Sequence, residues 1–351
     1  MAEVTTVAPS RAFASSWSGF ARRIGQAAFA AAGLILAAVP GEAQEGTPVI
    51  VNPGNAVVTG FSGTAPGQAP EGADPADYLT IDLNGPAARV VDLSTLGPQG
   101  QLTTAAKPFT VSAAQVGQVF GAALDSAAQP NVYLAATSAY GVSIYVPDQS
   151  GVIRRVRNGA AGAQFVPGQF GPPDQGGGPG SIWRIDGVTG EVTLFSTIDS
   201  AAQGVAALGG LVFDPRTQQL FVSDRISGLI HRLTLDGVDR GTFDHGKDGR
   251  QAAGLTPLPD GQLPAVDITN PAFDTTNPST WGYAPPSRRI FGLGVWQDRL
   301  YYAVAEGPQV WSVGIGQDGA FAGDARLEVE VPALQDGVEI ASITFDGLGT
   351  M

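Results

Sequence analysis

The chain has 351 residues, of which 48 are glycine and 26 are proline, and hydrophobic residues make up 43% of it. This mixture is typical of an all-β protein with many turns and argues against a disordered chain. The formal net charge is −13, so nucleic acid and anionic membrane surfaces are disfavoured as partners, because their phosphate groups would repel the protein. The chain has no cysteine, which excludes disulfides, thiolate metal sites and a cysteine nucleophile.

The N-terminus has the three parts of an export signal. Arg22 and Arg23 precede the uncharged run Ile24–Val39, and the small-residue segment Gly41–Ala43 follows it. We therefore predict that residues 1–44 are a signal peptide of the general secretory type, cleaved near Ala43, and that the protein is exported to the periplasm or the extracellular space. A retained membrane anchor is the alternative, although the run is shorter than the ~20 residues that a spanning helix needs.

Residues 45–77 contain strand-like segments followed by a linker rich in Gly, Pro and Ala. The segment Tyr78–Leu93 alternates apolar and polar residues on both sides of the turn Asn84–Pro86. This pattern predicts a hairpin. It matches a later pair of strands within Ser181–Ser196, so both hairpins are interpreted as the two outer strands of a repeated unit. We place the main domain at residues 78–351.

The most regular stretch is Leu208–His245, which reads LGGLVFDPRTQQLFVSDRISGLIHRLTLDGVDRGTFDH. It consists of four short strand segments, and Asp-Pro, Ser-Gly and Asp-Gly pairs mark the turns between them. Four short antiparallel strands in succession are the pattern of one blade of a β-propeller.

The same strand order recurs along the chain. The expected innermost strands are apolar and contain or follow a small residue: Val119–Asp125, Gly210–Asp214, Gly292–Trp296 and Ser342–Asp346. In the first copy the expected second, third and fourth strands are Val132–Ala135, Ser181–Ile185 and Glu191–Phe195. In the second copy they are Leu220–Ser223, Leu229–Leu233 and Arg240–Phe243. In the third copy they are Leu300–Ala303, Gln309–Val313 and Leu327–Val331. Glycine is expected where strands crowd toward a shared axis. The repeat predicts an all-β protein, a propeller of four-stranded antiparallel blades.

Two copies carry long insertions, at residues 139–180 and 246–289. The first falls between the second and third strands of its blade, and the second falls between two blades. Because strand direction alternates, both connections should emerge on the same face of the propeller. Both are rich in Gly, Pro and aromatic residues, including Trp281 and Tyr283. Loops of this length in a compact domain are often binding surfaces, and decorative packing over the channel mouth is the alternative.

The repeat does not end with a complete blade, because Ser342–Asp346 would be the first strand of a further blade. Closed propellers need at least four blades and more often six or seven. We expect the chain to be a piece of a longer propeller, and completion of the last blade by the N-terminal hairpin is the alternative.

Catalytic motifs are absent from the sequence. The two histidines, His231 and His245, lack partners at zinc-ligand spacing, and there is no G-x-S-x-G element of a serine hydrolase. The glycine-rich segments lack the Lys-Ser/Thr of a phosphate-binding loop. No catalytic residue can therefore be named.

Two acids follow second strands on the face expected to carry the insertions, Asp224 and Glu306. Together with Trp281 and Tyr283 they are our candidate ligand-binding residues. We predict no resident cofactor and no metal site, although converging carboxylates could hold Ca²⁺, which prefers oxygen ligands. Solvated turn residues are the alternative role for both acids.

The segment Phe221–Gly237, FVSDRISGLIHRLTLDG, resembles the repeat of the NHL and senescence-marker/gluconolactonase superfamily of propellers. The resemblance covers residues from about 117 to 346, and the chain as a whole looks like an exported bacterial propeller protein. A gluconolactonase-type activity would imply Asn and Glu ligands for a divalent metal on several inner strands. Asp224 alone stands where such a ligand is expected.

Our first hypothesis is therefore a binding or interaction scaffold that takes a protein or glycan ligand through the insertion-bearing face. The alternative is a metal-dependent lactonase or hydrolase of the gluconolactonase type. A third is a purely structural segment of a larger cell-surface protein.

Overall fold

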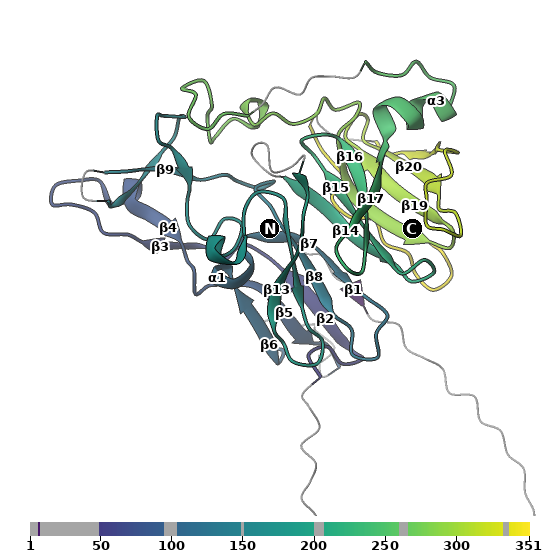
Figure 1. The fold of residues 1–351 in the computed structure, drawn as a ribbon, viewed down its shortest axis with the longest axis horizontal. Coiled ribbons are helices and arrows are strands. Elements are labelled where there is room, and N and C mark those ends of the chain that lie inside the picture. The colour runs from purple at the N-terminus through teal and green to yellow at the C-terminus, as the bar shows by residue number, and fades with distance from the viewer. Residues whose placement is uncertain are drawn as a thin grey trace, which may run out of the picture.

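The computed structural model describes residues 6–7, 49–94, 104–148, 151–199, 207–259, 266–332 and 337–351. Within them, sixteen strands form four antiparallel four-stranded sheets, and five further strands form two small sheets (Figure 1). The protein is thus an all-β propeller, as the repeat predicted. The expected signal peptide lies outside the described residues apart from Thr6 and Val7. No helix in the described ranges is long and apolar enough to cross a membrane.

The four large sheets follow one another in chain order. The first contains β1 (Thr6–Val7), β2 (Asn55–Thr59), β5 (Pro86–Asp92) and β6 (Phe109–Ser112). The second contains β7 (Val119–Leu124), β8 (Val132–Ala136), β12 (Ser181–Ile185) and β13 (Val192–Thr197). The third contains β14 (Leu208–Asp214), β15 (Gln219–Asp224), β16 (Leu229–Thr234) and β17 (Asp239–Asp244). The fourth contains β18 (Ile290–Trp296), β19 (Arg299–Val304), β20 (Gln309–Gly314) and β21 (Arg326–Glu330). The last three sheets match the predicted blades strand for strand.

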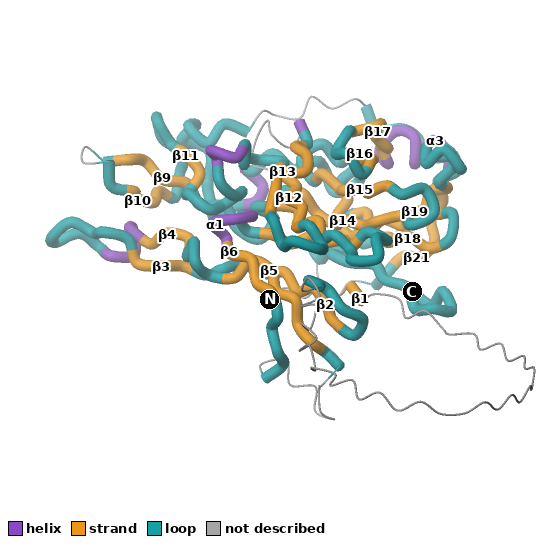
Figure 2. Tube along the Cα trace, turned by 60° about the horizontal axis from the view of Figure 1, so that its bottom comes forward, coloured by secondary structure: helices purple, strands orange, loops and turns teal. Residues whose placement is uncertain are grey.

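The remaining elements are short and lie in the connections. One small sheet pairs β3 (Thr64–Pro66) with β4 (Leu79–Ile81), and the other has the order β10 (Ile153–Val156), β9 (Ile144–Pro147), β11 (Gln164–Phe165). The helical turns are η1 (Pro75–Tyr78), α1 (Ala113–Val116), η2 (Pro173–Gln175), η3 (His245–Gly249), α3 (Arg250–Ala252) and η4 (Pro278–Thr280). The ribbon β3–β4 projects from the first sheet on the side where β9, β10 and β11 lie (Figure 2), and Arg154 of β10 is 3.5 Å from Asp77 of η1.

The expected hairpin at Tyr78–Leu93 is wrong. Strand β4 pairs with β3, whereas β5 pairs with β2 and β6, so the two halves of that segment belong to different sheets. The pairing of β2 with β5 also means that the first sheet spans residue 78, where we divided the chain. The turn at Asn84–Gly85 leads from one sheet into another, with Gly85 N–H donating to Asp82 O at 3.1 Å.

Innermost strands of neighbouring sheets lie directly against one another. A side chain on Gly210 of β14 would meet Leu293 N of β18 at 2.8 Å, and one on Gly292 of β18 would meet Ser342 N at 2.8 Å. Gly121 of β7 is equally confined by Gly209 O of β14. The expected fourth inner segment lies beside β18, where Gly292 N–H donates to Ile340 O at 3.0 Å. The last three sheets are therefore arranged radially, and their inner strands, together with the segment Ala341–Phe345, line a channel of about 380 Å³.

The core fills the spaces between adjacent sheets. One cluster joins the first three sheets around the fully buried Tyr133, Leu134 and Trp183, and a second joins the third and fourth sheets around Phe221 and Tyr302. Fully burying side chains of this size contributes about 1.5–3 kcal/mol each. Strands β8 and β15 are buried along their whole length, because the second and third sheets each pack between two neighbours.

Replacement of Gly210 by alanine tests the close approach of the inner strands. The added methyl group would force β14 and β18 apart, and overpacking of this kind costs about 1–3 kcal/mol. We expect Gly210→Ala to lower the urea midpoint of unfolding accordingly. Gly60→Ala is the control, because a side chain there meets nothing within 4 Å. Equal midpoints for both variants would contradict the packing described.

Candidate functional site

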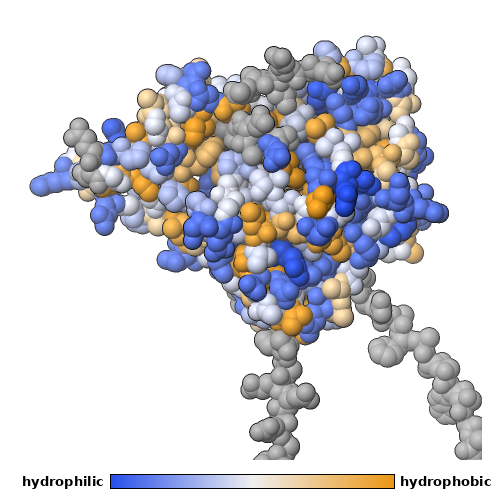
Figure 3. Space-filling view, viewed as in Figure 1, coloured by the Kyte–Doolittle hydropathy of each residue, from blue (hydrophilic) through white to orange (hydrophobic). Residues whose placement is uncertain are grey.

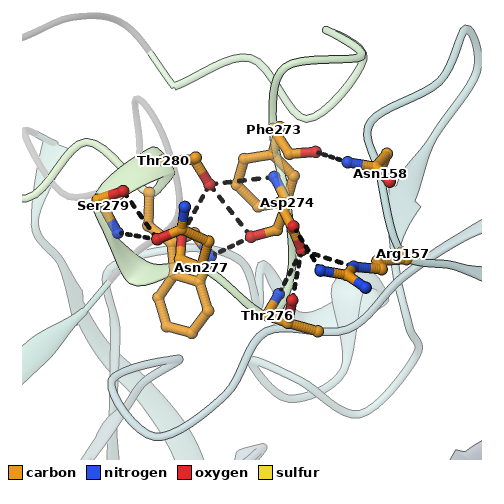
Figure 4. A network of polar contacts seen from close by, with 9 residues as sticks. Arg157, Asn158, Phe273, Asp274, Thr276, Asn277, Ser279 and Thr280 are labelled. Atoms are coloured by element: carbon orange, nitrogen blue, oxygen red, sulfur yellow. Dashed lines mark hydrogen bonds and ion pairs between the residues drawn. The ribbon is translucent and has the colours of Figure 1, made fainter.

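The two insertions contact each other on one face of the propeller, as expected from strand direction. Asn158 forms a β-bridge with Asp274, Gly159 N–H donates to Phe273 O at 2.9 Å, and Thr275 N–H donates to Arg157 O at 2.9 Å. Arg157 also donates from Nε and Nη2 to the two carboxylate oxygens of Asp274, at 3.2 and 3.0 Å (Figure 4). We call the described parts of residues 139–180 and 246–289 the cap.

An apolar cluster holds the cap together. It contains Val142, Ile144, Ala163, Phe273 and Trp281, all nearly inaccessible to solvent. The Arg157–Asp274 pair contributes less, because the Arg157 side chain is 67% exposed and exposed ion pairs are worth little. Hydrogen bonding to Arg157 nevertheless holds the pKa of Asp274 well below its usual range. The cap is thus a small packed unit and not a pair of independent loops.

Beneath the cap, at the mouth of the central channel, lies a pocket of about 510 Å³. Its walls come from segments far apart in the sequence that reach the same face: the connections after β8 and β15, the cap, the start of β18 and the segment before the fourth inner strand. The lining side chains that define it are Tyr140, Arg225, Tyr283, Arg289, Phe291 and Glu339. Alternating strand direction brings these six together.

Two ion pairs that share the carboxylate of Glu339 cross the pocket. Arg225 donates from Nη2 to Glu339 Oε2 at 2.6 Å, and Arg289 Nη2 lies 2.8 Å from Glu339 Oε1. The side chains of Arg225, Arg289 and Glu339 are 7%, 17% and 13% exposed. Ion pairs so far out of water are stronger than surface pairs, because screening is weak. Two guanidinium groups share one carboxylate, so the group carries a net charge of +1 in a protein of −13.

Aromatic rings fix the orientation of Arg225. Its guanidinium carbon lies 4.5 Å from the ring centre of Tyr283 and 4.4 Å from that of Phe291, which places the group between two rings. Cation–π contacts of this kind contribute about 0.5–2 kcal/mol. Burial raises the pKa of Tyr283 to about 12, so this residue is a neutral phenol, and its buried hydroxyl has no hydrogen-bond partner among the described residues.

The floor of the pocket is aromatic. Tyr140 contacts Phe61, Phe120 and Phe291, with ring centres 5.8, 5.1 and 5.8 Å away. Phe120 lines the channel and Phe291 lines the pocket, and their ring centres are 5.2 Å apart, so this cluster divides the two spaces. Tyr140 remains 47% exposed, and it therefore offers an accessible ring face beside the charged residues.

Of the four candidate residues from the sequence, Tyr283 alone lines this pocket. Asp224 is fully buried and caps its own turn, where it accepts hydrogen bonds from Ile226 N–H at 2.9 Å and from the Ser227 hydroxyl at 2.5 Å. Glu306 is on the surface, 3.7 Å from Arg250. Trp281 belongs to the apolar cluster of the cap and donates from Nε1 to Asp274 O at 2.8 Å.

The sequence analysis missed Arg225, Arg289, Glu339, Tyr140 and Phe291. Arg225 follows Asp224 directly, so the sequence pointed to the correct turn, but the side chain that lines the pocket is the arginine and not the acid. Neither histidine lines the pocket. His231 Nδ1 lies 2.7 Å from Asp239 Oδ2, whereas His245 packs against Tyr302 and Trp311 and burial lowers its pKa to about 3, which keeps its ring neutral.

The pocket does not suit a divalent cation. Glu339 is the one carboxylate among the described residues that line it, and both of its oxygens already bind guanidinium groups. Within the described ranges, no three His, Asp or Glu side chains gather in a way that could hold a metal ion. The donors present are those that bind anions.

Comparisons with known proteins return weak structural similarity only. No family model and no curated protein matches the chain. Among solved structures, it is similar to a glucose dehydrogenase (15% identity, 84% of this chain and 73% of that one, TM-score 0.38). It is also similar to AztD from Citrobacter koseri (13%, 83% and 62%, TM-score 0.29) and to virginiamycin B lyase from Staphylococcus aureus (13%, 84% and 93%, TM-score 0.28). Similarity at this level carries no argument about activity or ligand.

Replacement of Glu339 tests the contribution of the two ion pairs that share its carboxylate. Glu339→Gln would leave two largely buried guanidinium groups without a counter-charge, and breaking a buried pair costs about 3–5 kcal/mol. We expect a loss of stability near the lower end of that range in urea unfolding. Glu306→Gln is the matched control, since its exposed, 3.7 Å contact with Arg250 should be worth less than about 0.5 kcal/mol. Similar stabilities for the two variants would show that the ion pairs of Glu339 do not stabilise the fold.

Proposed function

We propose that this protein is an exported binding protein that takes a glycan in the pocket at the channel mouth, beneath the cap. The observation that carries the proposal is the combination of an accessible aromatic ring, Tyr140, with hydrogen-bonding charged groups in one concave site. Sugar rings offer apolar C–H faces and many hydroxyl groups, and a site with flat rings and fixed polar groups complements both. A volume of about 510 Å³ is within the usual range of small-molecule pockets.

The surface supports a concave site over a broad flat one. On the face seen in Figure 3, hydrophobic side chains occur in small groups among hydrophilic ones. Broad protein interfaces generally have a contiguous apolar centre. A protein partner that inserts a single side chain into the pocket is the competing occupant.

The metal-dependent lactonase alternative receives no support from the described residues. That chemistry needs several oxygen ligands to hold its cation, whereas the pocket presents two guanidinium groups and one carboxylate that is already paired. We therefore favour binding over hydrolysis for this site.

A glycan array with the purified protein tests the ligand and its place. Tyr140→Ala removes the accessible ring, and loss of a stacking residue should weaken retained glycans about tenfold or more, which corresponds to about 1.4 kcal/mol. Leu327→Ala is the control, because Leu327 on β21 is 45% exposed, close to the 47% of Tyr140. Equal loss in both variants would exclude the pocket, and an array without any retained glycan would exclude the ligand class.

The export proposal has a separate test. Expression of the full chain in a Gram-negative bacterium should release a periplasmic protein whose N-terminus, determined by mass spectrometry, lies near Ala43 or Gln44. Such cleavage removes β1, so the first sheet of the exported protein would consist of β2, β5 and β6. The Arg22–Arg23 pair and the apolar run after it are the reason for this expectation. An intact N-terminus on protein recovered with the membrane fraction would identify a retained anchor.

A further inference from the structure

We propose that the pocket selects acidic sugars, and that Arg225 and Arg289 recognise the anionic group. This inference rests on the proposed glycan binding and adds the chemical class of the ligand. It follows from the charge balance of the pocket and from the hydrogen-bond donors that remain after the internal pairs are formed.

The charge balance favours one more anion. Among the described residues, two guanidinium groups and one carboxylate are the charged groups that line the pocket. An arriving anionic group would bring the total to zero. Because the three side chains are 7–17% exposed, attraction to the uncompensated charge is screened less than it would be at the surface.

The remaining donors suit an oxyanion. Arg225 uses Nη2 for Glu339, and no described residue accepts from its Nη1. Arg289 donates from Nη1 to Ala284 O at 3.2 Å and from Nη2 to Glu339. Each Nη carries two N–H groups, so both side chains keep donors beyond those already in use. Guanidinium groups bind carboxylates and other planar or tetrahedral oxyanions strongly because the hydrogen bonds are charge-assisted.

The rigidity of Arg225 makes the site selective. The rings of Tyr283 and Phe291 hold its guanidinium from both sides, so little side-chain freedom is lost when a ligand binds. Tyr140, beside Phe291, offers its exposed ring to the sugar that carries the anionic group. A neutral sugar would gain the ring contact and hydrogen bonds to its hydroxyl groups, but not the attraction between opposite charges.

Digalacturonate and its dimethyl ester separate the two contributions, because esterification removes the charges and leaves the rings unchanged. We expect calorimetry at low salt to show at least tenfold tighter binding of the acid, and a smaller ratio in 0.5 M NaCl. A disaccharide that carries sulfate in place of carboxylate distinguishes the two sources of negative charge. Preference for either anion over the ester supports the inference.

Two variants assign the preference to the pocket. Arg289→Ala leaves Arg225 paired one-to-one with Glu339, so the fold should be retained while the net charge of the pocket falls to zero. The acid-to-ester affinity ratio should fall to about one, because the acid loses much more affinity than the ester does. Arg289→Lys keeps the charge and should restore most of the ratio.

The failures of the two proposals are distinguishable. Equal affinity of the wild-type protein for acid and ester would overturn the inference and leave glycan binding in place. Absence of binding by the acid, the sulfated sugar and the ester would count against both. A ratio unchanged in Arg289→Ala would place acid recognition elsewhere and overturn the assignment.

Discussion

The close approach of inner strands at the propeller axis is the constraint on which the rest of the structure depends. Where β14 meets β18 and where β18 meets the segment at Ser342, the positions in contact are glycines, because a Cβ atom would lie 2.8 Å from the neighbouring backbone. Radially arranged sheets can converge only if their inner strands carry no side chains at these points. With the inner strands so fixed, each sheet widens outward, and large side chains such as Trp183, Phe221 and Tyr302 fill the spaces between sheets.

That geometry also places the pocket. In every blade the first strand starts, and the second strand ends, at the same face, so Phe291 at the start of β18 and Arg225 after β15 converge on the channel mouth. Burial of charged groups there is costly because they lose hydration. The structure offsets this cost with two ion pairs through Glu339 and with rings on both sides of Arg225. Well-packed apolar residues would stabilise the fold as well or better, so the excess positive charge at this site is consistent with the anionic ligand that we propose.

The cap adds a wall to this site without changing the blades. Its two segments join through the bridge between Asn158 and Asp274 and through the apolar cluster around Phe273 and Trp281. Tyr283 and Arg289 then extend from the second segment into the pocket. The aromatic residues of the insertions are thus divided between holding the cap together and lining the site, and the same residue type serves both purposes.

The sequence by itself determined the blades, since alternating apolar residues and Gly- or Pro-containing turns encode strands and hairpins locally, as in Leu208–His245. It also determined which connections carry the insertions and that these share a face. It did not determine the partners of β5, because the Asn84–Gly85 turn signals a reversal but not which strand it pairs with, and the true partners β2 and β6 lie outside that segment. The pocket was decided by tertiary structure alone: Arg225 and Glu339 are 114 residues apart, and an arginine in a sequence looks the same whether it faces solvent or lies between two rings. Asp224 was chosen in its place because acids at strand ends can bind ligands, yet its carboxylate is already saturated by the turn that follows it.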